Sequence, residues 1–386
     1  MSFLQVLHNY QWDAISAAIQ AKTGREVEIA LQRAVRGQIS LTDFQALISP
    51  AARPHLETMA RLAHQQTLRR FGRTVQLFAP LYVSNECHNI CTYCGFSVNN
   101  KIPRKILSEA ELLREVGILK KQNFDHLLLV SGESNRKVGI PYFEKALRLC
   151  RPYFANLSME VQPLQTDEYA RLRESGLSAV LVYQETYNSE DYRKHHLKGR
   201  KADFNYRVET PDRLGRAGMP KIGLGALYGL EDWRVDSFFV ALHLDYLERA
   251  YWQSRYSLSF PRLRPHAGGL EPKVEMTDRD LAQTICAFRL FRNEVEISLS
   301  TREAPRFRDH AMHLGVTTMS AGAKTNPGGY FDAEENHDNS SLEQFHVSDE
   351  RPSPQVVAAL RAQGYEPVWK DWDASYDSSA RQQAAA

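Results

Sequence analysis

The sequence predicts an α/β protein whose main part is a (β/α)8 TIM-type barrel, with a helical extension before it and a shorter segment after it. Three observations lead to this prediction: eight short apolar runs between residues 75 and 320, helix-start signals between most of them, and polar clusters directly after several runs. Strands that alternate with helices form a parallel sheet, and eight such units close into a barrel. A chain of 386 residues accommodates one barrel with terminal additions or two ordinary domains.

The predicted strands are the eight apolar runs, which alternate with longer amphipathic stretches. They cover residues 75–81, 126–130, 157–161, 179–183, 222–226, 256–260, 295–299 and 316–320. Helix starts lie between them: a capping box begins at Ser108, a similar signal begins at Thr277, and Thr210 is followed by a proline suited to a first helical position. Function in such a barrel gathers at the carboxyl ends of the strands.

The ends of the chain read differently from the barrel. Residues 43–48 and 56–68 carry apolar residues at helical spacing, interrupted by Pro50 and Pro54. The C-terminal part is richer in turn-forming residues and is expected to pack on the barrel, with a short helix, an aromatic run and a frayed end. The turn-forming residues lie at 326–330 and 336–341, and the short helix covers residues 353–363. The aromatic run covers residues 368–372, and the frayed end covers residues 375–386. We therefore divide the chain into residues 1–70, 71–323 and 324–386.

Composition excludes several classes of protein. The net charge is +2, which offers no electrostatic attraction to nucleic acid or to a membrane surface. No apolar run approaches the length of a bilayer span, and the first ten residues lack the basic start and apolar core of a signal peptide. Clustered cysteines without a secretory signal are typical of reduced thiols that serve metals or catalysis. The sequence predicts a cytoplasmic protein without a nucleic-acid or membrane partner.

Three of the five cysteines lie within eight residues. Cys87, Cys91 and Cys94 have C-x3-C-x2-C spacing, which supplies one thiolate fewer than the four that usually hold a [4Fe–4S] cluster. One iron of such a cluster would remain open to a ligand that is not protein. The alternative is a zinc site, but structural zinc takes four closed ligands. His88 is the nearest further ligand, and its place beside Cys87 gives it poor reach around a tetrahedral ion.

The cysteine motif, with Gly95 and Phe96 directly after it, resembles the signature of the radical S-adenosylmethionine (SAM) superfamily. The resemblance implies one [4Fe–4S] cluster on the three cysteines, with SAM bound to the open iron through its amino and carboxylate groups. Tyr93 and Phe96 are then candidates to pack against the adenine of SAM, and the alternative for both is packing within the loop. The motif follows the first predicted strand, where a barrel places its active site.

Two further strand ends, and one arginine outside them, offer candidate cofactor-binding residues. Gly132 and Glu133 follow the second strand and resemble the "GGE" element of radical SAM enzymes, which lies near the amino group of the cofactor. Glu160 is an acid within the apolar third run, where an unpaired charge is costly, so it requires a partner. A cofactor or an arginine suits that requirement better than solvent does. Arg207 is a candidate partner for a carboxylate, and the alternative is an ordinary surface arginine.

Polar residues at the last strand ends are candidates for substrate binding. Arg264 follows the sixth strand, Ser300 and Arg302 follow the seventh, and Ser320 ends the eighth. Guanidinium groups bind carboxylates in a bidentate and directional manner, so these residues favour an amino-acid substrate. The alternative is a rim of ion pairs that ties loops together.

The remaining two cysteines do not extend the motif. Cys150 and Cys286 fall within predicted helices on the outside of the barrel, and we interpret them as packed, inert thiols rather than ligands of a second cluster. Neither a Ser/His/Asp hydrolase pattern nor a glycine-rich phosphate loop is evident in the sequence.

Taken over nearly its whole length, the sequence resembles the 2-iminoacetate synthases, the tyrosine lyases of bacterial thiamine thiazole biosynthesis. The resemblance is carried by SNECHNICTYCGFS, MEVQPL, VYQETY, HHLKGRKADF, SFPRLRP, LSTRE and PVWKDWD. It implies reductive cleavage of SAM to methionine and a 5′-deoxyadenosyl radical, which takes a hydrogen atom from L-tyrosine. The Cα–Cβ bond of tyrosine then breaks and yields p-cresol and 2-iminoacetate. The implied partners are the thiazole synthase of the thiamine pathway and a flavodoxin or ferredoxin as reductant.

Two related enzymes differ from this chain in their cysteines. The tyrosine lyase of hydrogenase maturation carries a further cysteine-bound cluster near its C-terminus, whereas no cysteine follows Cys286 here. Biotin synthase needs additional cysteines on its barrel strands, and these are missing as well. The alternatives to a tyrosine lyase are a radical SAM lyase of another aromatic amino acid, such as tryptophan, and a non-catalytic iron–sulfur or zinc protein.

Overall fold

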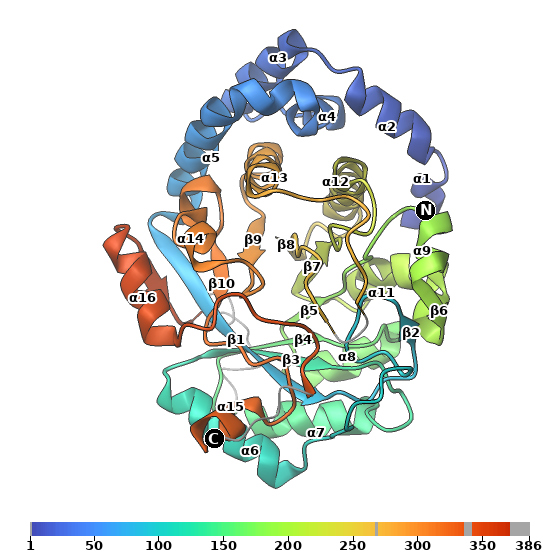
Figure 1. Ribbon diagram of the computed structural model, residues 1–386, viewed down its shortest axis with the longest axis vertical. Helices are drawn as coiled ribbons and strands as arrows, with labels where there is room; N and C mark the ends of the chain where they lie inside the picture. The colour runs from blue at the N-terminus through green and yellow to red at the C-terminus, as the bar shows by residue number, and fades with distance from the viewer. Residues whose placement is uncertain (1, 267–268, 336–341, 371–386) are drawn as a thin grey trace.

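The computed structural model describes residues 2–266, 269–335 and 342–370, and its centre is a closed barrel of eight parallel strands (Figure 1). The barrel closes because its last strand pairs with its first, with Gln76 opposite Thr318. In spatial order the strands are β1 (Thr74–Ser84), β3 (His126–Ser131), β4 (Asn156–Glu160), β5 (Ala179–Leu181), β7 (Lys221–Gly225), β8 (Arg255–Ser259), β9 (Glu296–Leu299) and β10 (Thr318–Ser320). The eight predicted strands are confirmed.

The strands form where the sequence is apolar because the barrel buries both of their faces. All six residues of β3 are buried, and helices cover the outside while side chains of alternate strands fill the inside. The helices that follow the strands are α6 (Glu109–Lys121), α7 (Ile140–Cys150), α8 (Thr166–Glu174), α9 (Ser189–His195), α10 (Phe204–Val208), α11 (Thr210–Arg216), α12 (Trp233–Ala250), α13 (Asp278–Phe291) and α14 (Pro305–Arg308). Short 3₁₀ turns, η2 (Arg200–Ala202) and η3 (Ala311–Leu314), complete this region.

The predicted helix starts are present. Ser108 accepts a hydrogen bond from the backbone of Glu111 at the start of α6, and Thr277 accepts one from Asp280 at the start of α13. The carboxylate of each acid in turn accepts a hydrogen bond from the backbone N–H of the capping residue, so both starts are complete capping boxes. Cys150 and Cys286 lie buried in α7 and α13, as expected for packed thiols.

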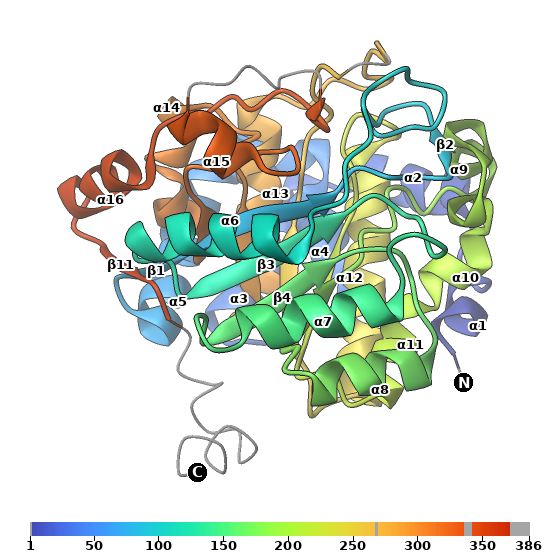
Figure 2. The ribbon, with the colours of Figure 1, turned by 90° about the horizontal axis from the view of Figure 1, so that it is seen from below.

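The N-terminal helices form an arc over one side of the barrel, opposite α6 and α7 (Figures 1 and 2). They are α1 (Phe3–Leu7), α2 (Trp12–Gln20), α3 (Gly24–Val35), α4 (Leu41–Ile48) and α5 (Leu56–Phe71), with the 3₁₀ turn η1 (Pro50–His55) before α5. Aromatic contacts hold this arc: the ring of Phe44 lies 4.7 Å from that of Phe288 on α13, and Phe3 stacks on His243 of α12 at 3.6 Å.

The C-terminal segment lies along the outside of the barrel and adds α15 (Gly329–Glu334), α16 (Ser353–Ala362) and β11 (Glu366–Val368). Strand β11 extends the sheet by pairing with the start of β1, with Thr74 opposite Glu366, and Trp369 packs edge-on against Phe124 at 5.1 Å. The expectations for residues 336–341 and 375–386, and for residues 371–372 of the aromatic run, lie outside the described residues. The division of the chain at residues 70 and 323 stays a prediction.

A small second sheet was not expected from the sequence. Strand β2 (Ile90–Cys91) pairs antiparallel with β6 (His196–Lys198), which places Cys91 opposite His196. Such short strands leave no periodic pattern to recognise. Nor does any helix among the described residues have the length and apolar character needed to cross a bilayer.

We predict that the C-terminal segment depends on one buried ion pair. Asp349 accepts from Arg308 at 2.5 Å, with side chains 0% and 1% exposed, and Arg351 also contacts Asp349. Changing Asp349→Ala should lower the free energy of unfolding by about 3 kcal/mol, because it leaves the Arg308 guanidinium buried without its carboxylate. Urea-induced unfolding measures this change.

The matched control is the exposed pair of Arg361 and Glu366, whose side chains are 59% and 62% exposed. The substitution Glu366→Gln should change the free energy of unfolding by less than about 1 kcal/mol. An equally small effect for Asp349→Ala would contradict the prediction.

Candidate active site

One cavity at the carboxyl ends of the barrel strands gathers almost all of the candidate site residues. The predicted residues that line it are Cys87, Cys91, Tyr93, Cys94, Phe96, Gly132, Glu133, Glu160, Arg207, Ser300, Arg302 and Ser320. Parallel strands end at one rim, so strand-end residues that are far apart in the sequence meet there. The cavity has a cysteine end, lined by the three cysteines, and a substrate end, lined by Glu160 and Arg302.

The cysteine loop, which we define as residues 85–104, is shaped by hydrogen bonds to its own backbone. The Arg104 guanidinium donates to the carbonyl oxygens of Asn85 at 2.7 Å and Phe96 at 2.8 Å, and also to those of two residues nearby in the loop. The Ser97 hydroxyl accepts from the backbone N–H of Cys91 at 3.2 Å. One arginine therefore ties the start of the loop to its end.

Glycine is required at two places where backbones approach closely. A Cβ atom at Gly95 would lie 2.5 Å from the carbonyl oxygen of Gln344, and one at Gly132 would lie 2.4 Å from that of Glu86. No side chain fits at such distances. Gly95 also donates its N–H to the Gln344 oxygen at 3.0 Å. The C-terminal segment is thus held directly against the cysteine loop.

The three cysteines are suited to a cluster. Cys91 is buried, and Cys87 and Cys94 are half-buried; burial raises the pKa of Cys87 to about 11 and raises those of the other two thiols. Across the described part of the chain, no three histidine, cysteine, aspartate or glutamate side chains are placed to hold a single metal ion. A [4Fe–4S] cluster makes a different demand, because each cysteine binds its own iron.

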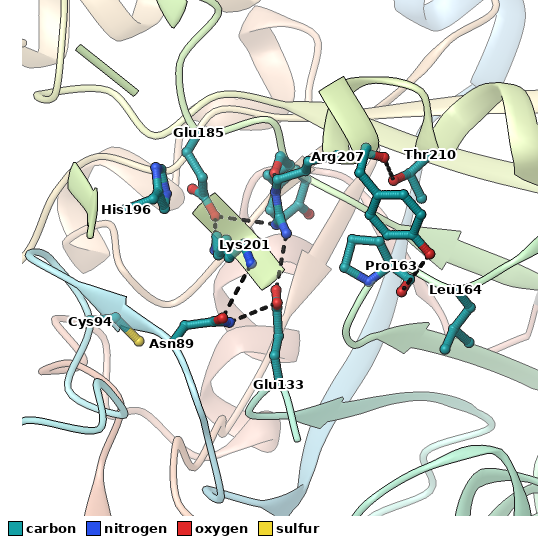
Figure 3. Close-up of polar contacts among 12 residues, drawn as sticks. Asn89, Cys94, Glu133, Pro163, Leu164, Glu185, His196, Lys201, Arg207 and Thr210 are labelled. Atoms are coloured by element: carbon teal, nitrogen blue, oxygen red, sulfur yellow. Dashed lines mark hydrogen bonds and ion pairs between the residues drawn. The ribbon is translucent and has the colours of Figure 1, made fainter. Parts of the chain in front are cut away.

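A buried charge network lies beside the cysteines (Figure 3). Arg207 pairs with Glu133 at 3.0 Å and with Glu185 at 3.5 Å, and Lys201 pairs with Glu185 at 2.6 Å. The Asn89 amide of the cysteine loop donates to Glu133 at 2.8 Å, while its oxygen accepts from the Lys201 backbone N–H. Arg207 is 5% exposed, so the surface alternative for this residue is wrong.

The charges in this network support one another. Burial alone would raise the pKa of Glu185, but Lys201 and Arg207 lower it below its ordinary value. Burial, which is the largest influence, and Arg207 would lower the pKa of Lys201, but Glu185, Cys91 and Glu133 together outweigh them and raise it. Both groups are therefore charged at neutral pH.

Glu185 is held in a strained backbone conformation, with φ of 73°. Its carbonyl accepts from Leu227 at 2.8 Å, and the next two residues are fixed by Asp236 of α12, which accepts from Thr186 Oγ1 at 3.1 Å and from the Tyr187 N–H at 2.7 Å. A left-handed conformation is costly for a residue with a side chain. The surrounding bonds offset that cost and aim the carboxylate at Lys201 and Arg207.

Tyr93 is anchored by a histidine of the second sheet. Its hydroxyl lies 2.6 Å from Nε2 of His196, whose Nδ1 lies 2.7 Å from the carbonyl oxygen of Tyr192. Since that carbonyl only accepts, Nδ1 carries the proton and Tyr93 donates to Nε2. Burial lowers the pKa of His196, which agrees with a neutral ring.

The substrate end of the cavity is defined by two ionisable groups that have no hydrogen-bond or ion-pair partner among the described residues. Burial, with the charge of Glu185, raises the pKa of Glu160 to about 7. The Arg302 guanidinium stacks on the ring of Phe345 at 3.4 Å, and burial lowers its pKa while Tyr82 and Glu160 oppose the change. A charged group in an apolar strand requires a partner, and Glu160 has none among the described residues. A bound ligand can therefore supply the hydrogen-bond donor for Glu160.

The two serines at this end hold the strand-end backbone. Ser300 Oγ accepts from the Arg302 N–H at 3.3 Å, and Ser320 Oγ accepts from the Thr301 N–H at 3.1 Å. Each hydroxyl keeps its own proton, which it can donate to a bound group.

Arg264 does not join the cavity, and its predicted placement is corrected. It pairs with Glu303 at 2.9 Å, and Arg262 contacts the same carboxylate and Asp278. Arg264 is absent from the residues that line the cavity. The alternative of a rim of ion pairs describes these two arginines, because Glu303 is 1% exposed and needs their charge.

Several residues of the site were not singled out in the sequence. Glu185 lies in VYQETY, just after the fourth predicted strand, and Lys201 lies in HHLKGRKADF. The available signal was a charged residue within a motif that carried the resemblance. Gln344 donates to Cys94 Sγ at 3.7 Å and accepts from the Tyr82 hydroxyl at 2.8 Å. Nothing in its own stretch of sequence pointed to this role.

Comparison with known proteins agrees with this geometry. Residues 81–240 match the radical SAM superfamily, and residues 259–366 match the Biotin and Thiamin Synthesis associated domain. The chain is 55% identical to the 2-iminoacetate synthase of Escherichia coli (strain K12) over 372 residues, which cover 96% of each chain. The chain belongs to the 2-iminoacetate synthase family. It is also 54% identical to the 2-iminoacetate synthase of Salmonella typhimurium (strain LT2), over 94% of each chain.

The fold of this 2-iminoacetate synthase family member is found in a solved structure as well. The crystal structure of HydG, a maturase of the [FeFe]-hydrogenase, is 26% identical in sequence and has a TM-score of 0.89. The match covers 97% of this chain and 84% of that chain. The predicted family, the radical SAM barrel and the pairing of a [4Fe–4S] cluster with SAM are therefore confirmed.

We predict that Glu160 makes stability depend on pH. Its pKa of about 7 lies above the ordinary value of 4.5, so the folded state binds the proton more tightly, and this stabilisation is lost as pH rises towards 7. Relative to Glu160→Gln, the wild type should lose about 1.4 kcal/mol for each pH unit across this window. Urea-induced unfolding of the wild type and of Glu160→Gln between pH 5 and 8 measures the difference in their free energies of unfolding. A difference that does not change with pH would contradict the prediction. Glu366→Gln serves again as the exposed control.

Proposed function

We propose that this protein is a radical SAM lyase that cleaves the Cα–Cβ bond of L-tyrosine to 2-iminoacetate and p-cresol. One observation carries the proposal: a single cavity joins three cysteines and a charge network at one end to an arginine and an acid at the other, both without an ion-pair partner in the described part of the chain. A cluster and cofactor suit the first end and an amino acid suits the second. Membership of the 2-iminoacetate synthase family supplies the substrate and the products.

The cofactor pair supplies the chemistry that amino acids cannot. When bound, the [4Fe–4S] cluster and SAM generate a 5′-deoxyadenosyl radical, which removes a hydrogen atom from tyrosine. The reaction consumes one electron to cleave SAM. A second electron and one proton convert the hydroxybenzyl fragment into p-cresol.

The residues of the cysteine end hold SAM. Glu133 accepts from its amino group, and Arg207 balances its carboxylate while remaining paired with Glu133 and Glu185. Tyr93 and Phe96 pack beside its adenine, and Gly132 lets the backbone approach. Glu160 lies between the two ends and accepts hydrogen bonds from a hydroxyl or ammonium group of the bound molecules, which supplies its missing partner.

The residues of the substrate end hold tyrosine. Arg302 binds the substrate carboxylate, because it lines the cavity and no described acid pairs with its guanidinium. Ser300 and Ser320 donate hydrogen bonds beside it. Placing the carboxylate there orients the amino group towards the cysteine end and keeps water from the reacting atoms.

The product determines the wider setting. An imine such as 2-iminoacetate hydrolyses readily in water, so direct transfer to the thiazole synthase of the thiamine pathway protects it. A flavodoxin or ferredoxin supplies the electrons. All of these steps belong to the cytoplasm.

The first test is product formation. Protein reconstituted with iron and sulfide under anaerobic conditions should convert L-tyrosine, SAM and dithionite into p-cresol and 5′-deoxyadenosine, measured by chromatography. The variant Cys91→Ala should form neither product, because it removes a ligand of the cluster, whereas the control Cys150→Ala should retain activity. Consumption of another aromatic amino acid without p-cresol would replace the substrate assignment. Absence of both a cluster and SAM cleavage would indicate a non-catalytic protein.

The second test concerns Arg302. Changing Arg302→Met should raise KM for L-tyrosine by about tenfold to hundredfold, because a charge-assisted hydrogen bond to the carboxylate is lost. The dissociation constant of SAM, measured by calorimetry, should change less than about twofold. An equal loss of affinity for both molecules would show that Arg302 acts on the whole cavity rather than on tyrosine.

A further inference from the structure

We propose that the outer surface of the cysteine loop and its neighbours is the docking site of an acidic one-electron carrier protein. This inference rests on the proposed function, since it names the partner that supplies the electrons of the reaction. We define the carrier surface by five exposed residues: Val98, Lys101, Arg136, Leu197 and Lys198. They come from three segments that all contact the cysteine loop or belong to it.

Leu197 and Lys198 lie on β6, the strand that pairs with β2, which contains Cys91. Its backbone pairs with β2 so that Cys91 lies opposite His196 and Ile90 opposite Lys198. His196 is buried at 2% and faces Tyr93, whereas the next residue, Leu197, is 60% exposed. Alternation along the strand places Leu197 on the face opposite His196, and Lys198, the last residue of β6, is exposed by its own position at the strand end. Figure 1 shows β2, β6 and α9 side by side at one end of the barrel.

The other segments are bonded to the same loop. The His88 N–H donates to the Glu133 carbonyl at 3.0 Å, and His88 Nε2 lies 3.3 Å from Ser134 Oγ. The exposed Arg136 is two residues after Ser134. Val98, which is 42% exposed, donates its N–H to the Asn89 carbonyl at 2.9 Å. The carrier surface is therefore formed by the cysteine loop itself and by two segments that are hydrogen-bonded to it.

The charge of this surface is positive and unbalanced. Residues 193–201 contain five lysines and arginines and no acid; two of the five, Lys194 and Lys201, pair with Asp191 and Glu185 outside this stretch. Lys101, Arg136 and Lys198 have no acidic partner among the residues that the structure describes. Two nearby acids are already paired, Glu86 with Lys137 and Asp191 with Lys194. The whole chain carries only +2, so this concentration of cations is local.

An acidic carrier fits these features for two reasons. The carrier surface combines exposed apolar residues, Leu197 and Val98, with exposed cations, and transient interfaces likewise combine apolar contacts with charged ones. Opposite charge speeds encounter and release without requiring tight binding. Each reduced carrier gives up one electron. One carrier supplies the electron that cleaves the sulfonium bond of SAM, and a second carrier supplies the electron that, together with a proton, completes p-cresol. The electrons must enter near the three cysteines, and the loop that carries these cysteines forms part of this surface.

The test compares two double charge reversals with the same change in net charge. The surface variant is Arg136→Glu with Lys198→Glu, and the control variant is Lys121→Glu with Arg148→Glu, two exposed residues near the carboxyl ends of α6 and α7. With reduced flavodoxin, and separately with reduced ferredoxin, the surface variant should raise KM for the carrier about tenfold. Calorimetry should show the same loss of affinity, and the loss should shrink at high salt.

Chemical reduction separates this inference from the proposed function. With dithionite, all three proteins should cleave SAM at the same rate, because neither pair of residues touches the cavity. A wild type that fails with dithionite would overturn the proposed function itself. Equal effects of the two double variants on carrier affinity would overturn the docking site. So would a surface variant that keeps its carrier affinity but loses affinity for the thiazole synthase, which would assign this surface to that partner instead.

Discussion

The site depends on one buried arrangement of opposite charges, Glu133 with Arg207 and Glu185 with Lys201, joined through the contact of Arg207 with both acids. Its members come from the ends of two strands and from the excursion between β5 and β7. Removing any one of them would leave a charge stranded in a medium that solvates it poorly. Because Asn89 bonds to both Glu133 and Lys201, the same network fixes the loop that carries the cysteines.

This arrangement explains why the cavity has two unlike ends. At the cysteine end the charges satisfy one another before any ligand arrives, so the geometry is preorganised and costs little to keep during binding. At the substrate end Glu160 and Arg302 have no hydrogen-bond or ion-pair partner within residues 2–266, 269–335 and 342–370, and they carry shifted pKa values. Perturbed groups of this kind gather at functional sites. The protein thus holds one end rigid and leaves the other to be completed by a ligand.

The barrel and most of the site could be predicted because both follow from local sequence. Buried parallel strands are continuously apolar, as in His126–Ser131, and barrel geometry sends their ends to one rim, which located Glu133 and Arg302. The same rule failed for Arg264, since the position of a residue in a strand end does not determine which acid its side chain will meet. The β2–β6 sheet has no periodic pattern, and the role of Gln344 arises from a contact between segments about 250 positions apart.

That last contact gives the C-terminal segment a function in the cavity as well as in the fold. Gln344 reaches Cys94 and Tyr82 at the cysteine end, while its neighbour Phe345 stacks on Arg302 at the substrate end. The segment is fixed to the cysteine loop by the Gly95 N–H, which donates to the Gln344 carbonyl, and to its own start by the Gln344 N–H, which donates to the Thr325 carbonyl at 3.1 Å. Two adjacent side chains thus contact both ends of the cavity. The relative position of cofactor and substrate is therefore set partly by a segment that contributes no residue to the barrel itself.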